Sequence, residues 1–220
     1  MTYADQLTIL SNMAKKDDTR VKLIESALDL IYQRSYVDVG IQSLCERAGV
    51  KKGNFYYYFH SKQDLLVQAL DCRAQELKTI LTPVFDKSVP PSKRIERLFE
   101  ELYQEQKAYQ DKSGRVRGCF FGNLALELST QDERIRRRVD NLLKVLVKLV
   151  EETLNELVDT GELAEIDAAS SAQAIVAFLE GVILFAKLRN DPELILSLAK
   201  TAKSIVVPRG EQLEDIEGVT

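Results

Sequence analysis

The segment from Gly49 to Lys62 constrains this chain more than any other. It places an aromatic run, Phe55 to Phe59, beside three lysines and no acidic residue. Aromatic side chains at this density are normally buried, but here cations and tyrosine hydroxyls come with them. A surface that contacts a polyanion needs that mixture, with cations for charge, hydroxyls for phosphate oxygens and a glycine where the backbone must come close. The segment therefore indicates a nucleic-acid-binding surface.

The residues before this segment have the spacing of a short helix. Four apolar or small residues fall at i, i+3, i+4 and i+7: Ile41, Leu44, Cys45 and Ala48. Gly49 then ends the helix, because glycine tolerates the left-handed position after a helix C-terminus. An earlier amphipathic helix is expected from the N-cap Thr19 to near Ser35. A short helix, a tight turn at a glycine and a second short helix form the helix-turn-helix pattern.

The rest of the chain also has apolar residues at helical spacing, so the predicted fold class is all-α. We expect a flexible arm over residues 1–18, a three-helix helix-turn-helix domain over 19–65, a helical ligand-binding and dimerisation domain over 66–207, and a disordered acidic tail over 208–220. Beyond the helix-turn-helix, helices are predicted over 62–81, 93–109, 119–128, 132–159, 167–188 and 192–206.

The charge is distributed unevenly. Residues 19–65 hold seven Lys/Arg and five Asp/Glu, a net of +2, whereas the rest holds 23 and 29, a net of −6. A basic head on an acidic body allows local binding of a polyanion and limits non-specific association.

Several function classes are disfavoured. The three cysteines lie far apart without CxxC spacing, so no disulfide framework, zinc site or cofactor is expected. A single histidine, with no phosphate loop and no nucleophile motif, argues against an all-helical enzyme. The N-terminus carries no signal pattern, and the apolar stretch 172–188 is interrupted by charged residues, so a cytoplasmic protein without a membrane span is expected.

Residues 19–65 resemble the N-terminal DNA-binding domain of the TetR family of bacterial transcriptional regulators. The resemblance rests on the pattern Ile41-x-x-Leu44-Cys45-x-x-Ala48-Gly49-Val50-x-Lys52-Gly53-x-Phe55-Tyr56-x-Tyr58-Phe59-x-Ser61-Lys62-x-x-Leu65-Leu66. A weaker resemblance, to one subgroup of the family, covers residues 118–129.

The resemblance implies a homodimer that places two recognition helices in the major groove of a palindromic DNA operator, and a small-molecule effector bound in the helical domain. It also implies DNA-contacting positions, which are Lys52, Gly53, Asn54, Tyr56, Tyr57 and Lys62, with Gln42 and Ser43 as further candidates. Among these, Lys62 is a phosphate contact of the family. The physical chemistry agrees, since Asn54 can pair with adenine and Lys52 with guanine, each worth ~1–3 kcal/mol of discrimination.

Lys51 departs from the family pattern, which commonly has a helix-capping serine there. A cation at a helix N-terminus opposes the helix dipole by ~0.3–1 kcal/mol. We hypothesise that a phosphate contact offsets this cost only on DNA. Phe55 and Phe59, four residues apart, are expected to pack in the core of the small domain.

The sequence indicates the effector site and the dimer interface less specifically than it indicates the DNA-binding positions. Candidate effector residues combine aromatic walls with polar groups: Tyr103, Cys119, Phe120, Phe121, Asn123, Glu127 and Phe178. Plain core packing is the alternative for each. The helices over 167–188 and 192–206 are expected to form the dimer interface, with an intramolecular core as the alternative.

Two other modes of control remain open. Cys119 follows Arg115 and Arg117, and nearby cations lower a thiol pKa, so this cysteine could sense oxidants or electrophiles. A small buried residue is the alternative for it. Control by a protein partner instead of a metabolite is the other mode.

Overall fold

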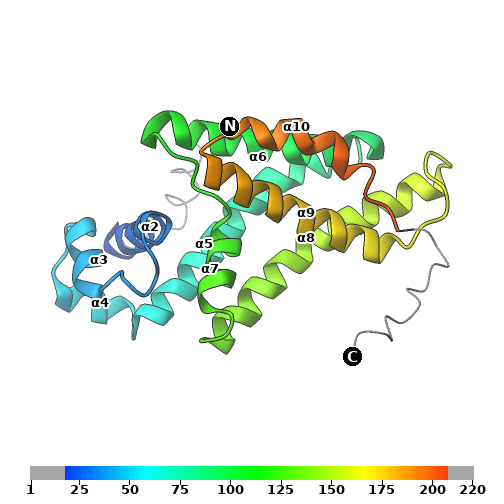
Figure 1. The fold of residues 1–220 in the computed structure, drawn as a ribbon. Helices are drawn as coiled ribbons and strands as arrows, with labels where there is room; N and C mark the ends of the chain where they lie inside the picture. The colour runs from blue at the N-terminus through cyan, green and yellow to red at the C-terminus, as the bar shows by residue number, and fades with distance from the viewer. Residues whose placement is uncertain (1–17, 208–220) are drawn as a thin grey trace, which may run out of the picture. The chain divides into compact units, whose positions relative to one another are not determined.

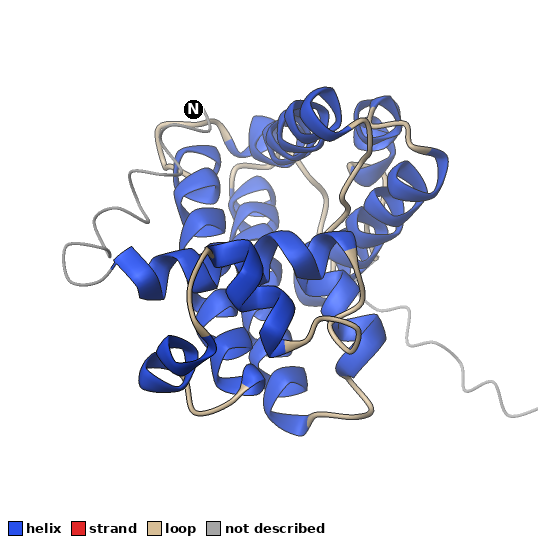
Figure 2. Ribbon diagram, turned by 90° about the vertical axis from the view of Figure 1, so that its left-hand side faces the viewer, coloured by secondary structure: helices blue, strands red, loops and turns tan. Residues whose placement is uncertain are grey.

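The computed structural model describes residues 18–207, and all regular elements in that range are α-helices (Figure 2). This confirms the predicted all-α class. The arm predicted over 1–18 and the tail predicted over 208–220 fall outside the described residues, apart from Asp18.

The described chain divides into two compact units. The first contains residues 18–81 and 120–142, and the second contains residues 82–119 and 143–207. The unit that holds the helix-turn-helix is therefore larger than the segment 19–65, because the chain returns to it with residues 120–142.

The first unit begins with four helices, which are α2 (Asp18–Gln33), α3 (Ile41–Ala48), α4 (Lys52–Tyr58) and the start of α5 (Lys62–Val84). Helix α2 packs against both α3 and α4, and Figure 1 shows the three helices grouped together. Their shared core consists of buried apolar side chains, among them Leu23, Ile24, Leu44, Phe55 and Phe59. The unit is completed by α7 (Phe120–Leu128) and the start of α8 (Glu133–Asp159).

The turn between α3 and α4 has the geometry that its sequence predicts. Gly49 adopts a left-handed conformation with φ of 67°. Its N–H donates to the carbonyl of Glu46 at 3.1 Å, and the N–H of Val50 donates to the carbonyl of Cys45 at 2.9 Å. These two bonds satisfy carbonyls that the end of α3 would otherwise leave unpaired.

The second unit is built on α6 (Pro91–Ser113), α9 (Ala168–Arg189) and α10 (Glu193–Ala202), together with the ends of α5 and α8. Helix α10 packs against both α6 and α9 (Figure 1). Pro91 occupies the first turn of α6, where its missing N–H costs nothing. Asp167 caps α9 by accepting a hydrogen bond from the N–H of Ser170 at 3.0 Å.

The helix predicted over 192–206 is wrong beyond Ala202, where α10 ends. The chain turns and runs to the beginning of α9 instead. There the N–H of Val207 donates to the hydroxyl of Ser171, and the N–H of Asp167 donates to the carbonyl of Val207, both at 2.8 Å. These long-range bonds compete successfully with a continued helix.

By length and composition alone, α9 could cross a membrane. However, 44% of its most apolar stretch is buried within the protein. A core helix of a water-soluble fold meets the same criteria, so the observation has little weight by itself.

Candidate nucleic-acid interface

Helix α4 presents one exposed face and one buried face. Lys52, Gly53, Asn54, Tyr56 and Tyr57 are exposed, and Tyr57 keeps 80% of its surface accessible. A methyl group added at Gly53 would meet nothing within 4 Å, so the space in front of the helix is open. The helix therefore offers cations, an amide and two phenol rings to a partner that approaches from outside.

Two buried aromatic rings hold this helix in place. Phe55 and Phe59 have no accessible surface, and their ring centroids lie 5.7 Å apart. Their predicted packing role is confirmed. The rings of Tyr56 and Phe55 pack in a T-shaped arrangement, with 5.3 Å between centroids, so an exposed ring is oriented by a buried one.

Lys51 is the N-cap of α4, with extended backbone angles and no capping hydrogen bond from its side chain. The N-cap of α3, Gly40, also provides no side-chain cap. Both helices of the motif therefore begin with N–H groups that no capping side chain satisfies, and such N-termini attract anions.

Two further predicted residues lie at the start of α3. Gln42 is exposed, and its amide donates to the carboxylate of Glu46 at 2.8 Å. Ser43 is partly buried. The Gln42 side chain is therefore already bonded within its own helix.

Lys62 has a different environment from the other predicted DNA contacts. Its ammonium donates to the carbonyls of Tyr36 at 2.9 Å and Val39 at 3.0 Å, both in the loop between α2 and α3. It also lies 4.1 Å from the centre of the Tyr36 ring. Burial lowers the pKa of Lys62, and the nearby carboxylates of Glu127 and Asp38 counteract part of that effect.

Glu127 of α7 binds the same loop. Its carboxylate accepts hydrogen bonds from the Ser35 hydroxyl at 2.5 Å and from the N–H groups of Tyr36 and Val37, each at 2.9 Å. Burial raises the pKa of Glu127, but these hydrogen bonds and Lys62 outweigh it and leave the pKa below its usual value. The carboxylate is therefore charged at neutral pH.

Comparison with known proteins places this geometry in a family. A family described as "Bacterial regulatory proteins, tetR family" matches residues 23–69, and one described as "Tetracyclin repressor-like, C-terminal domain" matches residues 93–202. The chain belongs to the TetR family. It is a DNA-binding transcriptional regulator with an N-terminal helix-turn-helix.

Similar TetR-family proteins cover most of the chain. The transcriptional regulator AcuR of Cereibacter sphaeroides is 30% identical over 192 residues, which cover 86% of each chain. The transcriptional repressor DhaR of Mycobacterium sp. strain GP1 is 26% identical over 199 residues, which cover 89% of this chain and 96% of DhaR. The crystal structure of a regulatory protein TetR from Rhodobacter sphaeroides superimposes with a TM-score of 0.74 at 29% identity, covering 84% of this chain and 97% of that one.

The predicted effector residues of this TetR-family chain are divided between the units. Phe120, Phe121, Asn123 and Glu127 lie in the first, and Tyr103, Cys119 and Phe178 lie in the second. Two of the aromatic residues pack within their own unit. Phe120 is buried with its ring 4.9 Å from that of Tyr32, and the ring of Phe178 lies 6.4 Å from that of Phe99. Their assignment to an effector site stays a prediction.

Cys119 lies beside a carboxyl group. Its thiol donates a hydrogen bond to Glu180 of α9, whose pKa is raised by burial and partly lowered again by that bond. Of the two nearby arginines, Arg117 forms an ion pair with Glu105 and stacks over the Tyr109 ring.

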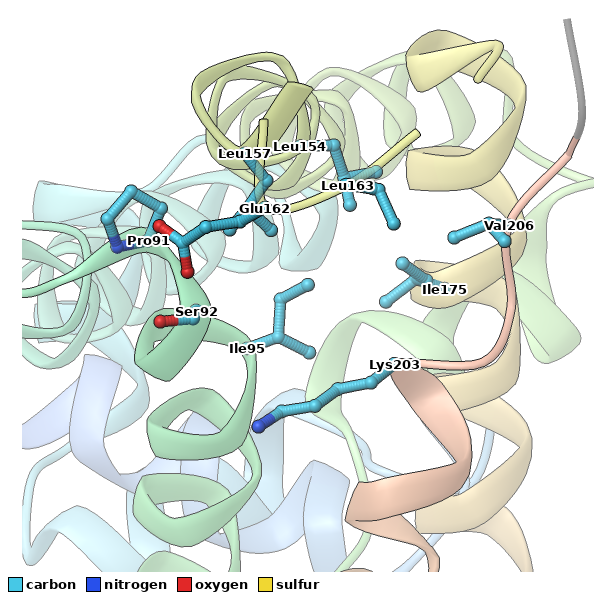
Figure 3. Close-up of a pocket in the computed structure, with 10 residues that line it drawn as sticks. All are labelled: Pro91, Ser92, Ile95, Leu154, Leu157, Glu162, Leu163, Ile175, Lys203 and Val206. Atoms are coloured by element: carbon cyan, nitrogen blue, oxygen red, sulfur yellow. The ribbon is translucent and has the colours of Figure 1, made fainter. Parts of the chain in front are cut away.

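A cavity of about 200 Å³ lies in the second unit (Figure 3). Its walls are mostly apolar, and the lining residues are Pro91, Ser92, Ile95, Leu154, Leu157, Glu162, Leu163, Ile175, Lys203 and Val206. None of the predicted effector residues is among them. Among residues 18–207, no cluster of His, Cys, Asp and Glu could hold a metal ion.

Sequence reasoning missed the loop contacts of Glu127 and Lys62. One signal was present in the sequence, because Glu127 is the only charged residue in α7, whose other residues are mostly apolar. A single carboxylate in such a segment is often tied to a specific donor.

Proposed function

We propose that the protein is a homodimeric repressor that binds a palindromic operator and is released from it by a small-molecule effector. The observation that carries the proposal is the exposed face of α4, where Lys52, Asn54, Tyr56 and Tyr57 stand on a helix anchored by Phe55 and Phe59. The repressor sign is supported by DhaR, whose name describes it as a transcriptional repressor.

The dimer is supported by apolar side chains that α9 leaves exposed. Leu184, Phe185 and Leu188 keep 50%, 49% and 75% of their surface accessible, and Leu196 of α10 is also exposed. The three α9 residues lie within one helical turn and a half of each other, and an exposed apolar patch of this kind is typical of an association site. We assign it to a second copy of the chain and not to lipid, since a DNA-binding regulator acts in the cytoplasm.

Release by an effector requires a change that reaches α4. Helices α5 and α8 both begin in the first unit and end in the second. Of the two, α5 directly follows α4 in the chain, so we expect an effector in the second unit to act through α5. Two recognition helices must stay about 34–36 Å apart to enter adjacent major grooves. An effector that binds more tightly to another spacing lowers operator affinity.

The test is binding of the purified protein to DNA from upstream of its own gene, measured by fluorescence anisotropy at physiological salt. We expect a specific complex that survives excess unrelated DNA. Asn54→Ala should lose specificity, while Lys87→Ala, an exposed change in the loop between α5 and α6, serves as the matched control. If none of the upstream fragments forms a specific complex, the result would count against the proposal.

A further inference from the structure

The loop between α2 and α3 is held from two sides by charged side chains from other helices. We propose that Glu127 and Lys62 form a clamp that positions this loop, and through it α3 and α4, for DNA binding. The proposal rests on operator binding by α4 and assigns to Glu127 the role of a positioning residue that does not contact DNA.

Glu127 satisfies the donors of the loop. One carboxylate oxygen accepts from the Ser35 hydroxyl and the Val37 N–H, and the other accepts from the Tyr36 N–H. Ser35 also accepts from the Val37 N–H at 3.2 Å, so the donors are drawn together around one carboxylate. Hydrogen bonds to a charged acceptor are stronger than neutral ones, so these bonds favour the observed conformation of the loop.

Lys62 satisfies the acceptors of the same loop. Its ammonium binds the carbonyls of Tyr36 and Val39 and faces the Tyr36 ring. Tyr36 is therefore held at its N–H by an anion and at its carbonyl and ring by a cation. Burial, followed by the charges of Asp132 and Glu127, raises the pKa of Tyr36 to about 12, which keeps its hydroxyl protonated.

The loop determines where α3 begins. Val39 is buried, and Gly40, the N-cap of α3, follows it directly. Helix α3 in turn leads through the closed turn at Gly49 to Lys51 and α4. A loop that moves would shift the start of α3 and, with it, the exposed face of α4.

The clamp also changes the expected role of Lys62. The family resemblance makes it a phosphate contact, but two of the three protons of its ammonium are already donated to loop carbonyls. If Lys62 mainly positions the loop, Lys62→Met should weaken DNA binding without changing its salt dependence. A lysine that neutralises a phosphate would instead contribute about 0.9 to the slope of log affinity against log salt.

The central experiment compares Glu127→Ala and Glu127→Gln, with Glu133→Ala as the matched control. Glu133 is exposed and pairs with Arg136 and Arg137 of its own helix. Operator affinity is measured at several salt concentrations, and amide hydrogen exchange at Tyr36 and Val37 reports the loop itself.

We expect Glu127→Ala to weaken operator binding roughly tenfold, as the loss of several hydrogen bonds predicts. The salt slope should stay at the wild-type value, and exchange at Tyr36 and Val37 should accelerate. Glu127→Gln keeps an acceptor oxygen and should recover part of the affinity. Glu133→Ala should behave as wild type in each measurement.

The outcomes separate the clamp from the proposed function. If the wild type binds no operator, the proposed function fails. If the wild type binds and Glu127→Ala binds equally well, the clamp is refuted. Should Glu127→Ala fail to fold, Glu127→Gln and Ser35→Ala decide, because each removes only part of the contact; wild-type affinity in both would refute the clamp.

Discussion

At the scale of single residues, Lys51 has an unusual position. It occupies the N-cap of α4 without a capping bond, at a position where serine would satisfy an N–H of the first turn. The positive charge of Lys51 opposes the helix dipole and so lowers the stability of the free protein. A bound anion, such as a phosphate of DNA, would offset this loss. We therefore propose that Lys51 lowers folding stability and raises affinity for DNA.

Lys51→Ser separates these two effects. We expect the free energy of unfolding to rise by ~0.5–1 kcal/mol, because serine caps the helix. Operator affinity should fall, and the salt slope should decrease by about 0.9, the contribution of one phosphate contact. Denaturant unfolding and anisotropy titrations measure the two quantities, with Lys87→Ser as control. Unchanged affinity and slope would show that Lys51 does not contact phosphate.

Substitutions of the aromatic residues of α4 should have different effects at buried and at exposed positions. Phe55→Ala removes a fully buried ring and should cost ~3–5 kcal/mol of unfolding free energy. Tyr57→Ala changes an exposed residue, so its unfolding free energy should stay within ~0.5 kcal/mol of wild type. Its operator affinity should nevertheless fall clearly. A Tyr57→Ala protein that binds operator normally would remove this residue from the interface.

Glu180 should make the stability of the protein depend on pH. Burial raises its pKa in the folded protein, so the folded state holds the proton more tightly than the unfolded state. The stability that depends on this proton is present at low pH and is lost as the pH rises through the folded pKa. Glu180→Gln should therefore raise the melting temperature more at about pH 8 than at about pH 5. An equal shift at both values would show that the carboxyl titrates normally.

At the scale of elements, local sequence signals predicted the helix-turn-helix well. Helix α3, its end at Gly49 and the start of α4 depend on contacts within a few residues, and the structure has each where the pattern indicates. The end of α10 was mispredicted because it depends on bonds between Val207 and residues at the beginning of α9. The spacing of apolar residues does not reveal hydrogen bonds to a distant part of the chain.

The candidate site shows the same division. The face of α4 could be predicted, since exposure follows from helix periodicity and two inward aromatics. The contacts of Lys62 and Glu127 with the loop between α2 and α3 could not be predicted, because Glu127 and Tyr36 are 91 residues apart in the chain. Only the fold brings the carboxylate to the loop.

Glycine substitutions test the turn and the helix separately. Gly49→Ala should cost ~1–2 kcal/mol, because its left-handed backbone is unfavourable for residues with a Cβ. Nothing lies within 4 Å of the added methyl, so the cost is purely conformational. Gly53→Ala, in a helical position, should instead stabilise the protein by ~0.5–1 kcal/mol. Thermal unfolding measures both changes in stability. A Gly49→Ala protein as stable as the wild type would contradict the left-handed conformation of Gly49.

At the scale of the whole molecule, the net charge differs between the helix-turn-helix segment and the rest of the chain. The surplus of cations lies in residues 19–65 and the surplus of anions elsewhere. Operator binding by such a protein should weaken steeply with salt, since its affinity depends on local phosphate contacts. The acidic remainder should limit binding to unrelated DNA.

If α9 forms the dimer interface, a charged substitution on its exposed apolar face should convert the dimer into a monomer. Phe185→Glu places a carboxylate on the exposed apolar face, and burying it against a second copy would be costly. We expect the mass from light scattering to halve and operator affinity to fall sharply. Leu126→Glu, on an exposed position of α7, should leave the mass unchanged. A Phe185→Glu protein that stays dimeric would place the interface elsewhere.

The contact between Glu127 and the loop also bears on how this protein can evolve. Two of its three donors are main-chain N–H groups, those of Tyr36 and Val37. Every amino acid except proline supplies that group. Val37, whose side chain is exposed, can therefore drift through almost any residue while Glu127 keeps its partner. Sequences of descendants should vary freely at position 37, with proline as the residue that selection removes.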